Sequence, residues 1–270
     1  MKEAKGIQRL VWAAVFCLSG VLTGTAQAKN NLTCTIVDQT GNPLVKQEVV
    51  LTSNAGGKEQ KKKTNDQGLV EFKGLDDGSY HLRGEIPGYV MSQSAPIELS
   101  GNKTHSCTHT IASVEYANAL FQEIQQLLTQ KKFAEAEERA SKAAAVLPNE
   151  SGVHYLLAVA RAYQGREAGA VESMKIAAQL EPEKYGSRVA AIHLAALDVL
   201  AKEAEAKKDY DGMVKKFEQM LTVADDKATV YFNWALAYAR IPKYPEAMSY
   251  LDKAIALKPQ DAEIQQMKIR

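Results

Sequence analysis

This sequence of 270 residues has almost no excess of charge and no long hydrophobic segment, and each shortage excludes a class of protein. Lysine and arginine total 33 against 32 for aspartate and glutamate, which leaves a formal net charge of +1. A chain without a basic surplus gives no electrostatic case for binding nucleic acid. The most apolar stretch, residues 10–22, is shorter than the roughly 20 residues of a membrane-spanning helix.

Sequence patterns that carry catalytic chemistry are also missing. The histidines are scattered, at His81, His105, His109, His154 and His193. No nucleophile elbow, phosphate-binding loop or H-E-x-x-H helix motif occurs in the chain. We therefore expect a protein that is not an enzyme and that needs no metal and no cofactor.

The first 28 residues have the three parts of a secretory signal peptide. A basic start precedes the apolar stretch over residues 10–22, and Ala26 and Ala28 then form an A-x-A cleavage site. We expect cleavage after Ala28 and export, with no membrane span in the remaining chain. A retained anchor helix is the alternative, which the short apolar stretch disfavours. Cys17 follows Phe16 rather than a small residue, which argues against lipid attachment.

Residues 32–111 show the alternation and frequent turns of a β-rich domain. The segment LTCTIVD places Leu32, Cys34 and Ile36 on one face of a strand. Further strands are expected at EVVLTS, LVEFK, SYHLRGEI and THSCTHTI, separated by glycine, asparagine and aspartate turns. Several short strands with such turns predict an antiparallel β-sandwich.

The turns follow a family pattern. The matching positions are Asp38, Gly41, Pro43 and Leu44, then Thr64, Gly68 and Phe72, then Gly74, Leu75, Gly78 and Tyr80. This order resembles the carboxypeptidase regulatory-like domain of the prealbumin-like sandwich group, over about 80 residues. The resemblance implies a sandwich and a non-catalytic accessory module over residues 29–113. It does not imply carboxypeptidase activity, because fold and function separate easily.

The remaining cysteines, Cys34 and Cys107, are both expected on inward faces. In the sandwich that this half resembles, the first and last strands are neighbours, so the two fit a disulfide, which export favours. Closing the loop between the two cysteines would stabilise the fold by on the order of 4 kcal/mol. Two buried thiols, or zinc held with His105 and His109, are the alternatives. The two histidines would lie roughly 13 Å apart at Cα on one strand, so we expect them at the sheet rim.

A lysine cluster marks one β segment. It comprises Lys58, Lys61, Lys62 and Lys63. Lysines on an edge strand prevent unwanted strand pairing, so a solvated edge is the simple interpretation. Binding to an anionic polymer of the cell envelope is the alternative.

Residues 114–270 show a repeated pattern that is typical of helices. Pro148 and Pro182 lie 34 residues apart and close similar phrases, and Pro259 closes a third. The copy over residues 228–261 resembles the tetratricopeptide repeat (TPR) most clearly, with Trp234 and Tyr238 at characteristic places. The same spacing gives copies over 117–150, 151–184 and 194–227. Residues 185–193 are extra and are expected to lengthen the next helix.

The resemblance implies a groove lined by the first helix of each repeat. Carried onto this chain, the partner-binding positions are Phe121, Gln125, Tyr155, Val159, Tyr163, Asp198, Lys202, Phe232, Asn233, Leu236 and Arg240. The aromatic residues Phe121, Tyr155 and Phe232 would suit a peptide with apolar anchors. Alternatively, these aromatics pack between neighbouring repeats.

The sequence thus predicts an α+β multidomain protein, with an antiparallel β-sandwich followed by a TPR-like α-helical solenoid. We expect an exported, non-catalytic scaffold that binds a protein or peptide partner in the helical groove. The pairing of domains resembles that of bacterial envelope proteins, which implies the periplasm or the cell envelope. The alternative is a cell-wall or glycan-binding envelope protein that uses the sandwich.

Overall fold

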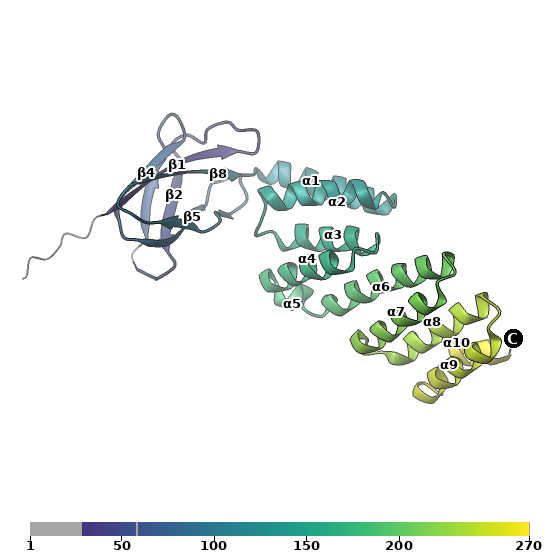
Figure 1. Cartoon of the computed structure of the whole chain (residues 1–270). Coiled ribbons are helices and arrows are strands. Elements are labelled where there is room, and N and C mark those ends of the chain that lie inside the picture. Colours follow the sequence, from purple (N-terminus) through teal and green to yellow (C-terminus); the bar gives the residue numbers. More distant parts are fainter. Residues whose placement is uncertain (1–28, 58, 270) are drawn as a thin grey trace, which may run out of the picture.

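The structure, a computed structural model, describes residues 29–57 and 59–269, with strands before residue 112 and helices after it (Figure 1). This arrangement confirms the predicted fold class. The predicted signal peptide, Cys17 and Lys58 lie outside the described residues. Within the described ranges, no helix combines the length and apolar character needed to cross a bilayer.

The β domain consists of two facing sheets. The described strands are β1 (Asn30–Asp38), β2 (Glu48–Ser53), β3 (Gln60–Lys63), β4 (Leu69–Leu75), β5 (Gly78–Gly84), β6 (Ser92–Gln93), β7 (Ile97–Leu99) and β8 (Thr104–Ile111). One sheet has the order β4-β1-β8, and the other has the order β3-β2-β5-β6, with β7 also paired to β5. All pairs are antiparallel except β1 with β8, which run parallel. The whole second sheet separates β1 from β8 in the chain, which leaves room for that parallel return.

Alternation along the strands builds the core between the sheets. Leu32, Cys34 and Ile36 of β1 are fully buried, as their shared face predicts. Phe72 of β4 and Leu82 of β5 are also fully buried, in the same cluster. The inward residues of both sheets thus exclude water from one layer, which is the main source of the stability of this domain.

Gly68 is required where the β3–β4 connection approaches β1. Its φ is +71°, and a Cβ placed on it would lie 2.7 Å from the carbonyl oxygen of Ile36 and 2.9 Å from Cβ of Pro43. Gly101 has a similar φ of +80° but nothing within 4 Å of a built Cβ. Alanine substitutions at the two glycines therefore distinguish the cost of backbone strain from the cost of steric overlap.

We expect Gly68→Ala to lower the free energy of unfolding by about 3 kcal/mol, and Gly101→Ala by about 1 kcal/mol. Both variants force alanine into the left-handed region, but only the first also pushes a methyl group into the backbone of β1. Urea denaturation of the two variants measures the difference. Equal losses would show that the approach of Gly68 to Ile36 carries no energetic weight.

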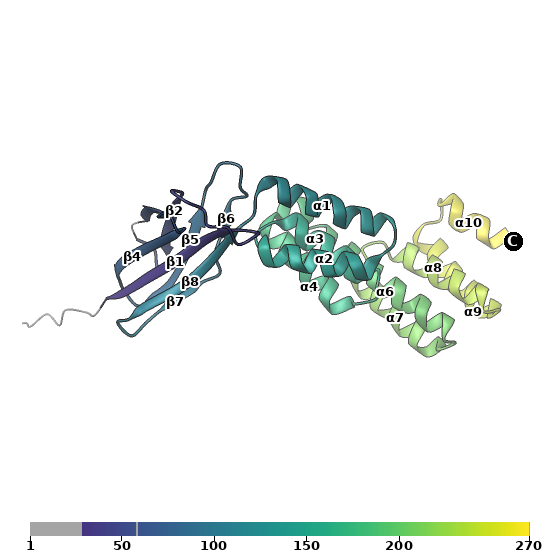
Figure 2. The same ribbon diagram turned by 90° about the horizontal axis from the view of Figure 1, so that it is seen from above.

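The helical half is a succession of helix hairpins (Figures 1 and 2). The hairpins are α1 (Val114–Thr129) with α2 (Phe133–Val146), α3 (Ser151–Ala162) with α4 (Glu167–Leu180), α6 (Arg188–Ala206) with α7 (Tyr210–Val223), and α8 (Lys227–Arg240) with α9 (Tyr244–Leu257). The short α5 (Pro182–Tyr185) precedes α6, and α10 (Ala262–Ile269) packs against α9. With 19 residues, α6 is longer than the 14 residues of α8.

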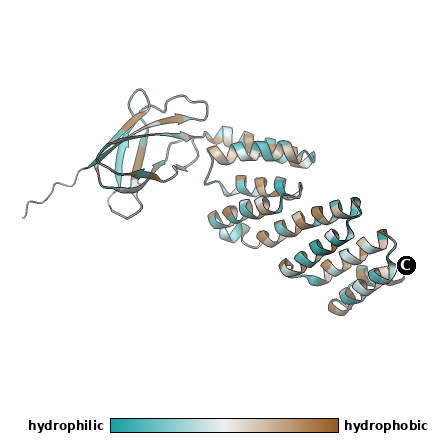
Figure 3. Ribbon diagram, viewed as in Figure 1, coloured by the Kyte–Doolittle hydropathy of each residue, from teal (hydrophilic) through white to brown (hydrophobic). Residues whose placement is uncertain are grey.

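Small residues let the helices approach each other. Ala158 of α3 and Ala170 of α4 are fully buried, as are Ala235 of α8 and Ala254 of α9. Figure 3 shows apolar and polar residues alternating along the helices, as expected of helices that are buried on one side. No single hairpin buries its apolar surface alone, so neighbouring hairpins stabilise one another.

A buried polar network joins α2, α3 and α4. The carboxylate of Glu137, whose side chain is 12% exposed, accepts from Nε of Arg161 at 3.1 Å and from Nε2 of Gln164 at 2.8 Å. Arg166 also reaches this carboxylate, at 2.9 Å. Nη1 of Arg161 donates to Oγ of Ser173 at 2.8 Å. Arg161 of α3 is thus hydrogen-bonded to both α2 and α4.

The helical half begins directly at the end of the sandwich. Val90 N donates to Ala112 O at 2.8 Å, and Val114 N donates to Gly88 O at 3.0 Å. The Ser113 amide donates to Oε1 of Gln39 at 2.9 Å, and its hydroxyl caps α1. These bonds hold the start of α1 against the loops of the sandwich.

Candidate functional site

The structure divides the predicted groove residues into two sets. Five of them line one cavity of about 310 Å³ between α6, α7 and α8, here named the α6–α8 groove. Its lining residues are Asp198, Ala201, Lys202, Glu205, Phe217, Asn233, Leu236 and Arg240. The predicted positions that do not line this cavity are Phe121, Gln125, Tyr155, Val159, Tyr163 and Phe232.

The groove follows from helical periodicity on two facing helices. Asn233, Leu236 and Arg240 are spaced by three and four residues, which places them on one side of α8. Asp198, Lys202 and Glu205 have the same spacing on α6. Glu205 and Phe217 were not among the predicted groove residues, although Glu205 lies two turns after Asp198 and the spacing alone would have found it. The position of Phe217, on α7, required the fold.

Ion pairs hold the charged side chains of the groove in place. Nζ of Lys202 lies 2.6 Å from Oδ2 of Asp198, one turn away on the same helix. Arg240 bridges α8 to α6, since its Nε and Nη2 each donate to the carboxylate of Glu205 at 2.7 Å. These bonds lower the pKa of the Glu205 carboxyl and raise the pKa of Arg240. Both groups are therefore charged at neutral pH.

Asn233 is the polar side chain of the groove that has no hydrogen-bond partner among the described residues. It is exposed, and its amide makes no hydrogen bond within the described part of the chain. Leu236 beside it is half-buried. An amide can donate and accept at once, so Asn233 can pair with a peptide group of a bound chain.

A second cavity, of about 480 Å³, extends the groove. It shares Lys202, Glu205 and Arg240 with the first, and it adds Ala206, Lys208, Tyr210 and Ile241. Lys208 has a φ of +58° in the turn between α6 and α7. Repeat positions did not predict Lys208 or Tyr210, because they follow the end of the first helix.

The predicted aromatic anchors pack against neighbouring helices. A Cβ built on Gly152 would lie 2.9 Å from Cε1 of Phe121. Tyr155 stacks on Tyr185 with ring centroids 5.2 Å apart. Phe232 packs against the cluster that contains Ile264 of α10. All three rings thus pack against neighbouring helices, and their role as anchors for a partner stays a prediction.

The other predicted positions lie outside the cavity in different surroundings. Tyr163 is 52% exposed and stacks on Phe133, with ring centroids 4.9 Å apart. Gln125 is exposed on α1, and Val159 packs half-buried against the cluster around Met174.

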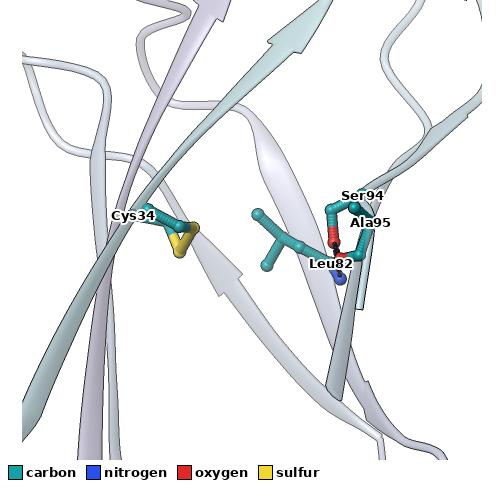
Figure 4. Close-up of a disulfide and its surroundings, with 5 residues drawn as sticks. Cys34, Leu82, Ser94 and Ala95 are labelled. Carbon is teal, nitrogen blue, oxygen red and sulfur yellow. Dashed lines mark hydrogen bonds between the residues drawn. A yellow bond between two sulfur atoms is a disulfide. The ribbon is translucent and has the colours of Figure 1, made fainter. Parts of the chain in front are cut away.

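In the sandwich, Cys34 and Cys107 form a disulfide, which confirms the predicted pairing. The two residues are direct neighbours in the β1–β8 register, with Cα atoms 4.5 Å apart. Figure 4 shows the bond facing Leu82 of the opposite sheet. No cluster of three or more histidine, cysteine, aspartate or glutamate side chains able to hold a metal occurs within the described ranges.

The histidines beside Cys107 differ from each other. His105 Nε2 lies 3.1 Å from the Ser100 carbonyl at the end of the sheet. His109 is 7% exposed, and its Nε2 lies 3.2 Å from Oγ of Ser92. The expected rim position is therefore wrong for His109, because β8 turns its odd-numbered side chains inward and Ser92 covers this one. Burial lowers the pKa of the His109 imidazole.

The described lysines of the cluster, Lys61, Lys62 and Lys63, are exposed on β3. This strand lies at an edge of its sheet, as expected. Nζ of Lys62 donates to the Glu71 carbonyl of β4 at 2.6 Å.

Comparison with known proteins matches the β domain to one family model. The family model of the carboxypeptidase regulatory-like domain matches residues 31–112. The match supports a carboxypeptidase regulatory-like β-sandwich domain over these residues. A comparison of the sequence with curated proteins gives no match.

Several solved structures match parts of the chain. The Bacillus anthracis TIE protein is 29% identical over 32% of this chain and 16% of its own, with a TM-score of 0.27. GBS52, the minor pilin of Streptococcus agalactiae, is 19% identical over 33% of this chain and 46% of its own, with a TM-score of 0.30. The MamA RS-1 ArsTM double mutant is 20% identical over 56% of this chain and 80% of its own, with a TM-score of 0.33. This chain thus spans less than half of the TIE and pilin chains.

Proposed function

We propose that this chain is an exported, non-catalytic scaffold whose TPR-like helical half binds a segment of a partner protein in the α6–α8 groove. The observation that carries the proposal is that five residues predicted from the repeat resemblance line one cavity. The disulfide supports export, because such bonds persist in oxidising compartments.

The groove chemistry indicates what kind of segment fits. The two adjoining cavities contain the cations Lys202, Lys208 and Arg240 and the carboxylates Asp198 and Glu205, which is three positive against two negative charges and a net charge of +1. Lys208 has no carboxylate within ion-pair distance in the described residues. An extended segment with an acidic side chain at Lys208 and a peptide group at Asn233 satisfies both unpaired groups.

The single tryptophan of the chain that starts at Lys29 provides a reporter. Trp234 follows Asn233, and its ring stacks on Phe217 at 5.3 Å between centroids. Phe217 in turn lines the groove. Filling the groove is therefore expected to change the emission of Trp234.

The test uses random 12-residue peptides displayed on phage and selected on the immobilised protein. The strongest peptide is then synthesised and titrated against Trp234 emission. We expect selected peptides to be enriched in aspartate or glutamate, and Asn233→Ala to weaken their binding about tenfold, through the loss of about 1.4 kcal/mol of hydrogen bonding.

Gln125→Ala is the matched control. It removes an exposed amide from another predicted groove position that lies outside the cavity, and its binding should stay within about twofold of the wild type. Selected peptides that bind Asn233→Ala as tightly as the wild type would refute the proposed site. A loss with Gln125→Ala instead would move the site to the first hairpins.

A further inference from the structure

We propose that the outer edge of β8 binds an uncharged, extended segment of a second protein as an added strand. The sheet order places β8 at an edge, with β1 as its one partner strand in the described residues. This site lies in the sandwich and is separate from the α6–α8 groove, so it goes beyond the proposed function.

The register shows which backbone groups of β8 are free. Asn31 N donates to Lys103 O at 3.0 Å, and Asn31 is level with Thr104. In a parallel pair, alternate residues of each strand turn both their N–H and C=O groups to the partner. The backbone N–H and C=O groups of the odd-numbered β8 residues therefore point toward β1. The even-numbered residues Thr104, Ser106, Thr108 and Thr110 direct their N–H and C=O groups away from it.

These outward groups have no partner in the fold. Within the described residues, none of the four N–H or four C=O groups of Thr104, Ser106, Thr108 and Thr110 takes part in a hydrogen bond. Such a row of unpaired donors and acceptors is complementary to one class of ligand, the main chain of another extended segment.

The edge strands β3 and β4 of this sandwich are protected by charged side chains, but β8 is not. The edge strand β3 carries three consecutive exposed lysines. At the β4 edge, Glu71 and Lys73 are charged, and Lys62 occupies the Glu71 carbonyl. The β8 strand THSCTHTI has no lysine, proline or acidic residue, and its outward side chains are threonine and serine. Charged edges prevent strand addition, whereas β-branched residues favour it.

A cleft beside the last residues of β8 provides space for part of the added strand. It has a volume of about 500 Å³ and lies between Thr108–Thr110 of β8, the segment Gln93–Pro96 and the end of α2. No lysine, arginine, aspartate or glutamate lines it, so a charged occupant would lose hydration without gaining a counter-ion. The charge match therefore favours an uncharged segment with small or β-branched side chains.

The walls of the cleft also favour one strand over a second copy of the chain. A single segment needs about 4.8 Å beside β8. A second copy pairing through its own β8 would bring a three-stranded sheet to an edge that is flanked by Gln93–Pro96 and α2. The proposed occupant is therefore an extended segment of another protein.

Amide hydrogen exchange of the free protein is the first part of the test. We expect the amides of Ser106, Thr108 and Thr110 to exchange at least 100-fold faster than those of Cys107 and His109, which face β1. Protection of the even-numbered amides in the monomer would show that the edge is already covered and would overturn the proposal. Protection that rises with protein concentration together with a doubled mass would assign the edge to a second copy, which also overturns it.

The second part uses a defined probe, a fluorescent peptide of alternating threonine and valine with blocked ends. We expect it to slow exchange of the even-numbered β8 amides more than tenfold and to leave the odd-numbered amides unchanged. The same peptide with N-methyl groups on the amides of one edge should bind at least tenfold more weakly, because those donors are lost. Equal binding of both peptides, or no binding of either, would refute strand addition.

Lysine substitutions on the protein complete the test. Ser106→Lys with Thr108→Lys copies the protection seen on β3 and should weaken the probe at least tenfold. The matched control is Thr33→Lys with Thr35→Lys, on the central strand β1 and level with Ser106 and Thr108, and it should stay within twofold. Equal effects of the two pairs would mean that the lysines act on the sheet as a whole. Asn233→Ala should not change probe binding, which separates this site from the helical groove.

Discussion

Reduction of the disulfide between Cys34 and Cys107 is expected to lower the free energy of unfolding of the sandwich by about 4 kcal/mol. The bond joins residues 73 positions apart, so it removes much of the conformational freedom of the unfolded domain. That amount is a large part of the stability of a single domain. Urea denaturation followed by far-UV circular dichroism and tyrosine emission, with and without reductant, measures it.

The variant Cys34→Ala/Cys107→Ala separates the cross-link from the packing of the sulfur atoms. It should be about as unstable as the reduced wild type, and reductant should not change it further. Trp234 lies in the helical half, so the urea midpoint of its emission should stay the same with and without reductant. A loss below about 1 kcal/mol on reduction would contradict the expected role of the bond.

Glu137→Ala is expected to destabilise the helical half by about 3 kcal/mol. The substitution leaves the guanidinium of Arg161, whose side chain is 25% exposed, without its carboxylate partner between α2 and α3. It also removes one of the acceptors of Gln164 and the carboxylate that pairs with Arg166. Urea denaturation monitored at Trp234 and by circular dichroism at 222 nm measures the loss.

Glu138→Ala is the matched control for this prediction. Glu138 is the next residue on α2 and pairs with Lys142 at the surface, where both side chains are well exposed. Its loss should cost about 0.5 kcal/mol or less. The double variant Glu137→Leu/Arg161→Leu should recover much of the stability that Glu137→Ala loses, because the buried charge without a partner is gone. A double variant that is less stable than Glu137→Ala would show that the network stabilises through more than charge pairing.

The two proposed binding sites use different chemical groups. One uses side chains, and the other uses backbone N–H and C=O groups. The proposed helical site uses Asn233 of the α6–α8 groove and Lys208 of the adjoining cavity to bind a peptide group and an acidic side chain. The β8 edge offers backbone groups and accepts an uncharged strand. Their readouts, Trp234 emission and β8 amide exchange, are independent, so either site can fail its test without affecting the other.

Sequence patterning by itself determined the local elements of this protein. Alternation along residues 32–37 defined the buried face of β1, because neighbouring side chains of a strand point to opposite faces. The family pattern of turn residues located Gly68, whose positive φ only glycine adopts easily. The disulfide followed from inward cysteines on the first and last strands of the resembled sandwich.

The tertiary structure decided which nominated residues meet. The repeat resemblance treated Phe121, Tyr155 and Phe232 like Asn233 and Arg240, yet the first three pack against neighbouring helices and the last two line a cavity. The helices that pack against each residue make this difference, and their packing depends on contacts far apart in the chain. The ion pair of Glu137 with Arg161 and the edge position of β8 also depend on how the elements are arranged. Periodicity fixes the face of a residue, whereas the arrangement of the elements determines what that face contacts.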